Sequence, residues 1–268
     1  MALGNIANFT SIDDLSQMGS PIHRIHPSCK VIVCTIFITI VMSFSSDKIS
    51  PLMPFFLYPI VIASLGKIPL GKIIKMVLPA LPFILLVAIF NPLFDRKPVF
   101  YLGSFTVTHG MLSFLSIIMR SFLTLFSVLL LVATTGIYNI GYVLQSFKLP
   151  SIFVTQLVFL HRYIFVLTEE TITMKRAVLS RSPYGKHPDL ITFGHMISSL
   201  ITRSIDTSTR IYTAMLARGF NGKIELQKKF VMAKKEIAFS IAWIVFFISA
   251  RVWNIPEALG TFVLGLTK

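Results

Sequence analysis

Residues 110–135 read GMLSFLSIIMRSFLTLFSVLLLVATT, and this run decides the class of fold. It is longer than the roughly 20 residues that a helix needs to cross about 30 Å of hydrocarbon, and its single charge is Arg120. A charge in the middle of a spanning helix costs about 2.5 to 3.5 kcal/mol on insertion scales. We therefore expect Arg120 to face protein or to reach the lipid surface. It either holds helices together or lies on a substrate path, where a lone arginine would repel a divalent cation.

Four further runs on either side of this one carry no charge. They are residues 31–46, 49–65, 76–94 and 237–250. With 54% hydrophobic residues, 13% charged residues and a mean hydropathy of +0.77 over 268 residues, the chain has more apolar side chain than one soluble core could bury. The sequence predicts an all-α integral membrane protein with about five to six membrane helices and long amphipathic cytoplasmic coupling helices.

The distribution of charge indicates how the chain is oriented. The net charge is +14, and twelve of the 25 Lys and Arg residues lie between Lys175 and Lys235, just before the last apolar run. Such a cluster is typical of a cytoplasmic segment beside a membrane, so it predicts a lipid bilayer as the partner and no nucleic acid. Residues 1–30 lack the apolar core of a signal peptide. We expect a multi-pass plasma membrane protein with a cytoplasmic N-terminus.

The segment 137–235 mixes apolar and charged positions where the other segments are apolar all round. Two long amphipathic helices are predicted there, over 151–181 and about 190–217, separated by prolines and a glycine. The chain thus divides into a cytoplasmic N-terminal segment (1–30), a four-helix membrane region (31–136), amphipathic cytoplasmic coupling helices (137–235) and a C-terminal membrane helix with its tail (236–268).

Each amphipathic helix carries a polar stripe along one face. In the first helix the members are spaced by seven, and in the second by three and four, so each set shares a face. The charged residues that we assign to these coupling helices are Arg162, Glu169, Glu170, Arg176, Arg203, Asp206 and Arg210.

Both helices also end in an arginine that precedes a small residue. The first ends in Arg181-Ser182 and the second in Ala217-Arg218-Gly219. Gly219 is a natural helix stop, and an arginine in the last turn favours the helix dipole by about 0.3 to 1 kcal/mol, so either arginine alone is explained as a cap. As a pair, the two arginines are suited to bidentate carboxylate partners on a soluble protein.

The chain lacks the chemistry of an enzyme. No G-x-x-x-x-G-K-[ST] motif occurs, so ATP, if it is used, must be bound by partner subunits. A membrane-embedded enzyme needs clustered carboxylates, whereas the 11 acidic residues stand singly or in adjacent pairs. A channel or secondary carrier would line the bilayer midplane with polar groups from broken helices. The proline breaks at Pro79, Pro82 and Pro92 fit such a protein, but intramembrane carboxylates are missing. We expect no catalytic residues, no cofactor and no metal site, even at His23 and His26.

Three motifs carry a resemblance to a known family. They are SPIHRIHP at 20–27 followed by Lys30, RYIF at 162–165 followed by Glu169 and Glu170, and AMLARGF at 214–220 followed by Gly222. Together they resemble the transmembrane T component of energy-coupling-factor importers, of the cobalt and nickel type (cobalt transport protein Q family). The first motif is usually Ser-Pro-Leu-His-Arg-Leu-Asp-Pro, so His26 stands where the family has aspartate.

The resemblance implies a function and a set of partners. In that family the two arginine motifs engage two ATPase subunits, and Arg181 and Arg218 are the matching positions, with Ser182 replacing the usual glycine. In that family a separate membrane subunit, the S component, captures the substrate. The resemblance also allows a small accessory membrane subunit as a partner. The implied role is a non-catalytic energy-coupling subunit of an ATP-driven cobalt or nickel importer. A vitamin-type T component remains the alternative.

Overall fold

The computed structural model describes residues 15–16, 18–45, 49–95, 98–102, 105–181, 189–222 and 232–252. The chain divides into two compact units. Unit 1 is formed by Met1–Ile140 together with Phe230–Lys268, and unit 2 by Gly141–Lys229. Each unit is described by itself below.

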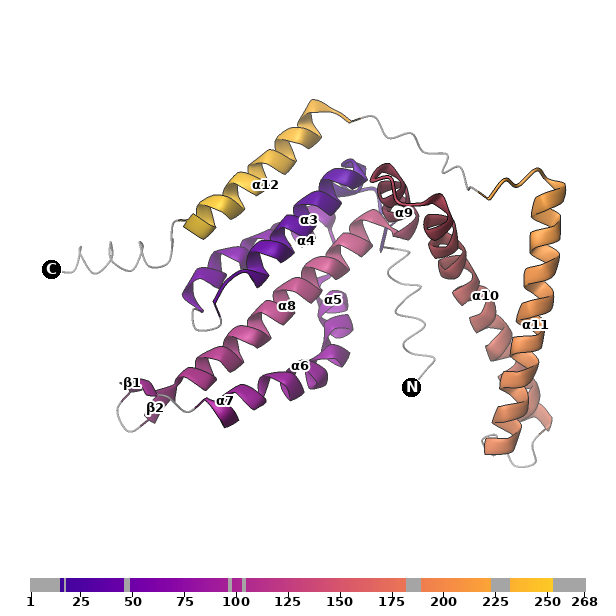
Figure 1. The fold of residues 1–268 in the computed structure, drawn as a ribbon, viewed down its shortest axis with the longest axis horizontal. Helices are drawn as coiled ribbons and strands as arrows, with labels where there is room; N and C mark the ends of the chain where they lie inside the picture. The colour runs from indigo at the N-terminus through magenta and orange to yellow at the C-terminus, as the bar shows by residue number, and fades with distance from the viewer. Residues whose placement is uncertain are drawn as a thin grey trace. The chain divides into compact units, whose positions relative to one another are not determined.

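Almost all the described residues are helical, which confirms the predicted class of fold (Figure 1). Unit 1 contains α2 (Pro21–Arg24), α3 (Pro27–Met42), η1 (Ser50–Phe56), α4 (Leu57–Gly66), α5 (Leu70–Val77), η2 (Leu78–Ala80), α6 (Leu81–Ala88), α7 (Phe90–Phe94), α8 (His109–Thr135) and α12 (Lys234–Val252). Helix α9 (Ile137–Ser146) lies across the division, and unit 2 contains α10 (Ser151–Arg181) and α11 (Leu190–Ala217). A small antiparallel hairpin, β1 (Pro98–Leu102) and β2 (Phe105–Thr108), was not expected.

Among the described residues, three helical stretches are long and apolar enough to cross a membrane: Leu70–Phe94, His109–Thr135 and Ser151–Arg181. Two shorter apolar helices cover Pro27–Met42 and Ser50–Gly66. The third stretch is α10, which we had assigned to the cytoplasmic segment, and its apolar first half gives it this composition. Helix α12 was expected to span but is not among the three, because charged residues stand at both of its ends.

Helices α3 and α8 run antiparallel and are joined near both ends by buried cations. The Lys30 Nζ near the start of α3 donates to the Thr134 carbonyl oxygen near the end of α8 over 2.8 Å. At the opposite end of the pair, Arg120 donates to the Ser45 carbonyl oxygen beyond α3, and to the Ser116 hydroxyl over 2.9 Å. Arg120 is 9% exposed. These contacts favour the interpretation of Arg120 as a residue that holds helices together.

An aromatic cluster forms the core between α3, η1, α4 and α12. The Phe37 ring lies 4.7 Å from the Tyr58 ring and 5.3 Å from the Phe247 ring, measured between centroids. Helix α12 runs alongside α3, and its Arg251 donates to the Ser43 carbonyl oxygen over 3.1 Å (Figure 1). Because aromatic rings bury large areas and prefer tilted pairs, this cluster attaches α12 to the rest of unit 1.

The histidines of the motif at 20–27 bond within the chain. The His26 Nδ1 accepts from the Ser28 backbone N–H over 3.2 Å and so caps α3, a role that an aspartate also performs well. This explains how His26 can replace the usual aspartate. His23 lies 2.6 Å from the Ser20 hydroxyl and 2.9 Å from the Leu15 carbonyl oxygen. Partial burial lowers the pKa of His23, because it disfavours the charged ring.

Gly110 allows α7 and the start of α8 to approach closely. A Cβ at this position would lie 2.5 Å from the carbonyl oxygens of both Asn91 and Asp95. We expect Gly110→Ala to lower the free energy of unfolding by about 1 to 3 kcal/mol, because backbone atoms must move. Thermal unfolding of the purified chain in detergent measures this. Gly71→Ala is the control, because nothing lies within 4 Å of its Cβ. Equal melting temperatures for the two variants would contradict the close approach.

Candidate functional site

Unit 2 is built around two long antiparallel helices, α10 and α11. The Phe159 ring, near the start of α10, lies 6.5 Å from the ring of Phe220, which follows the end of α11. Further along, the Arg203 Nη1 of α11 lies 3.4 Å from the Glu170 Oε1 of α10. The chain continues in α10 for roughly 22 residues beyond Phe159, which at about 1.5 Å per residue corresponds to about 33 Å. The two helices therefore carry their final arginines toward opposite ends of the pair.

Arg218 is presented by a well-formed helix end. The Phe220 N–H donates to the Met215 carbonyl oxygen, and the Gly219 N–H to the Leu216 carbonyl oxygen, both over 3.0 Å. Gly219 has a φ of 81°, and these two bonds form a Schellman motif. A Cβ at Gly219 would meet nothing within 4 Å, and Arg218 is exposed. The arrangement holds the last turn rigid and leaves the guanidinium free to meet another molecule.

Arg181 ends α10 in a similar position. It is the last residue of the helix, and its side chain is exposed. Ser182 lies outside the described residues, so its part in the site stays a prediction. Ala217 is the last residue of α11 and is also exposed.

Most residues of the two predicted polar stripes are exposed, and one pair of charged residues joins the two helices. Arg162, Glu169 and Arg176 all lie exposed on α10, and Asp206 and Arg210 lie exposed on α11. Glu170 points to the other helix and forms the ion pair with Arg203. An exposed pair of this kind contributes only about 0.2 to 1 kcal/mol, so it adds little to the stability of the helical pair.

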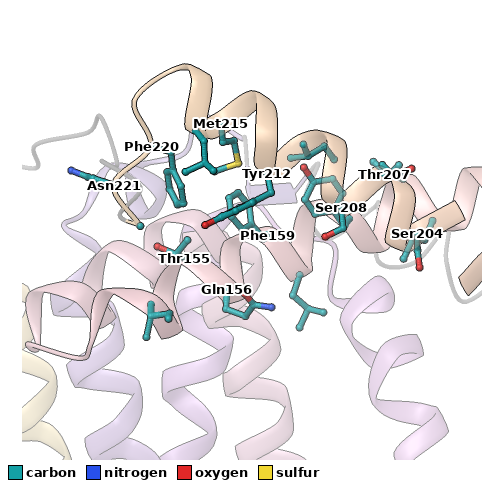
Figure 2. Close-up of a pocket in the computed structure, with 18 of the residues that line it drawn as sticks. Thr155, Gln156, Phe159, Ser204, Thr207, Ser208, Tyr212, Met215, Phe220 and Asn221 are labelled. Atoms are coloured by element: carbon teal, nitrogen blue, oxygen red, sulfur yellow. The ribbon is translucent and has the colours of Figure 1, made fainter. Parts of the chain in front are cut away.

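An apolar groove of about 760 Å³ lies between α10 and α11 and was not predicted from the sequence (Figure 2). Phe159 from α10 and Tyr212, Met215 and Phe220 from the other side line one part of it. In the other part, small residues of α11 leave space: Ser204, Thr207 and Ser208. The signal that could have revealed the groove is this change, along α11, from small hydroxylated residues to large apolar ones on one face.

Among the described residues there is no group of three or more His, Cys, Asp or Glu side chains that could hold a metal ion. The two cysteines, Cys29 and Cys34, are buried as free thiols. Unit 2 offers an apolar groove, and an exposed arginine at the end of each of its two long helices, Arg181 and Arg218.

The chain is similar to proteins of two organisms. An uncharacterized protein of Methanocaldococcus jannaschii is 28% identical over 81% of this chain and 83% of its own length. A second uncharacterized protein of the same organism is 25% identical over 86% of this chain and 82% of its own length. A protein of Methanocorpusculum labreanum, provisionally named fused cobalt transport protein CbiMQ, is 28% identical over 42% of this chain and 19% of its own length.

The family comparison covers most of the chain. Residues 18–230 match the CbiQ family, which is described as cobalt transport protein. This range includes the motif at 20–27, the apolar helices α3 to α8, and the helical pair with its arginines. The chain therefore belongs to the CbiQ family of cobalt transport proteins, whose members are membrane components that work with partner subunits.

Proposed function

We propose that this chain is the energy-coupling membrane subunit of an ATP-driven cobalt or nickel importer. It transmits the movement of two ATPase subunits to a membrane subunit that binds the substrate. The observation that carries the proposal is the placement of Arg181 and Arg218. Both are exposed at helix ends, and the antiparallel pairing carries them apart, so that each can meet a different ATPase subunit.

The helical pair is suited to transmit force. Two ATPase domains that approach each other would push on the two ends of α10 and α11, and those helices contact each other through the Glu170–Arg203 pair and the Phe159–Phe220 contact. A helix has fixed length and resists bending, so displacement of one tip moves the whole element. The chain needs no nucleotide site of its own for this function.

The apolar groove supports the part of the proposal that concerns the substrate-binding membrane subunit. We assign it to a membrane helix of the substrate-binding subunit. Small hydroxylated residues such as Ser204, Thr207 and Ser208 allow helices to approach closely in lipid. Helix α10, which forms the other wall, is apolar enough to lie at membrane depth.

The experiment is co-expression of the chain with two ATPase subunits and a substrate-binding subunit of a metal importer. We expect an affinity tag on this chain to retain both ATPase subunits, and cells with all subunits to accumulate radioactive cobalt or nickel. The chain alone should neither hydrolyse ATP nor support uptake. ATP hydrolysis by the isolated chain would refute the proposal, and uptake of a vitamin with no uptake of metal would favour the vitamin-type importer.

A further inference from the structure

Exposed cations gather at one end of unit 1. Several contacts show which helix ends meet there. The Lys30–Thr134 bond joins the start of α3 to the end of α8, and a Cβ at Gly66, the last residue of α4, would lie 3.7 Å from Thr134. Phe239, in the second turn of α12, lines a small cavity together with Lys30 and Thr134. This end thus comprises the start of α3, the ends of α4 and α8, and the start of α12.

The cations at this end come from separate elements and all are exposed. Arg24 ends α2, Lys67 follows α4, Lys72 lies in the first turn of α5, and Lys234 and Lys235 open α12. Lys75 is exposed one turn further along α5. Among the described residues of unit 1, the carboxylate at this end is Glu236, which accepts the Ala233 backbone N–H over 2.9 Å. The end therefore carries a clear excess of positive charge.

The same helices expose apolar side chains directly beside these cations. Leu65 and Leu70 flank the turn that holds Lys67, Ile74 follows Lys72 on α5, and Ile237 follows Lys235 on α12. A surface that passes from apolar to cationic within one helical turn matches the boundary between hydrocarbon and lipid headgroups. Lysine and arginine stems can lie along the hydrocarbon while their charges reach the headgroups.

The backbone at Lys67 allows its charge to be removed without disturbing the fold. Lys67 has a φ of 52°, in the left-handed region that favours glycine, and it closes the end of α4 there. Glycine would take this conformation without the steric cost of a Cβ. Replacement of Lys67 by glycine therefore removes the charge without straining the turn. Lys148, in unit 2, is the other described residue besides glycine with a positive φ, at 61°.

We propose that this end of unit 1 is a binding surface for anionic phospholipids, with Arg24, Lys67, Lys72, Lys234 and Lys235 contacting the lipid phosphates. By the positive-inside rule these lipids belong to the cytoplasmic leaflet. The surface holds the helix ends at a defined depth in the membrane. The proposal does not depend on the identity of the transported substrate.

The test is native mass spectrometry of the full chain in detergent with added dioleoyl phosphatidylglycerol or dioleoyl phosphatidylcholine. We expect the chain to bind the anionic lipid more tightly than the zwitterionic one. Each cation near a membrane surface contributes about fivefold to such binding. Lys67→Gly should therefore weaken phosphatidylglycerol binding about fivefold while keeping the fold, because glycine suits the left-handed turn. Lys67→Gly combined with Lys72→Gln, Lys234→Gln and Lys235→Gln should remove the preference.

Lys148→Gly is the matched control, because it removes one exposed lysine and one left-handed Cβ from unit 2. It should leave the lipid preference unchanged. Equal binding of the two lipids by the unaltered chain would overturn the proposal, as would equal losses in Lys67→Gly and Lys148→Gly. If the combined variant keeps its lipid preference but no longer retains the ATPases, the cations contact protein and the proposal is also wrong.

Discussion

The double variant Arg181→Glu and Arg218→Glu reverses the charge at the end of each long helix. We expect it to abolish ATP-driven metal uptake while the chain remains inserted and folded. Both side chains are exposed, so their replacement disturbs no packing. In the proposed complex each guanidinium enters an ATPase groove and pairs with a carboxylate. Loss of one partner from a buried, hydrogen-bonded charge pair costs about 2 to 5 kcal/mol, much of it from the charge left unpaired.

The single variants separate the two positions. Arg218→Glu should weaken retention of the ATPases, or uncouple ATP hydrolysis from uptake, more than Arg181→Glu does, because Ser182 departs from the usual glycine of the motif. Co-purification measures assembly, and uptake per ATP hydrolysed measures coupling. Arg210→Glu is the matched control, since Arg210 is exposed on α11 away from the tip. It should retain assembly.

The cap interpretation makes a different prediction for the same variants. If Arg218 only stabilises the end of α11, its loss costs at most about 1 kcal/mol of local stability, and transport survives. The Schellman bonds of Gly219 and Phe220 remain in either case, because they are made by the backbone. Nearly normal ATP-driven uptake by the double variant would therefore reject docking through these arginines.

Arg120→Glu should have the largest effect on the folding of unit 1. The guanidinium donates to the Ser45 carbonyl oxygen and the Ser116 hydroxyl at a buried position. A carboxylate there would face the carbonyl oxygen and would itself be buried without a cation, which costs about 3 to 5 kcal/mol. We expect the variant to give little folded protein, measured by gel filtration and thermal unfolding in detergent.

Arg120→Lys is the control for this position, because it keeps the charge and can still donate to the Ser45 carbonyl oxygen. It should fold and should support metal uptake at close to the unaltered rate. A well-folded Arg120→Glu variant with altered metal selectivity would instead place Arg120 on a substrate path.

Much of the fold follows from local features of the sequence. The apolar run at 110–135 forms α8, and the helices predicted over 151–181 and about 190–217 correspond to α10 and α11. The end of α11 at Ala217 follows from Gly219, because only glycine enters the left-handed conformation without cost. Composition and periodicity act within a few turns of a helix, which is why these elements can be read directly.

The contacts between helices could not be read in this way. Glu169 and Glu170 are adjacent and chemically alike, and only the pairing of α10 with α11 turns Glu170 toward Arg203. The partner of Lys30 is the carbonyl oxygen of Thr134, which carries no sequence signal because every residue has one.

The sequence by itself determined that this chain is a helical membrane protein with an arginine at the end of each of two long helices, because hydropathy, helix length and helix stops are local properties. The tertiary structure alone decided that those arginines lie at opposite ends of an antiparallel pair, and that a groove opens between the helices. It also decided that Arg24, Lys67, Lys72, Lys234 and Lys235 share one end of unit 1. These features depend on which helix faces which and in what register. That is set by the packing of residues far apart in the chain, such as Phe159 with Phe220.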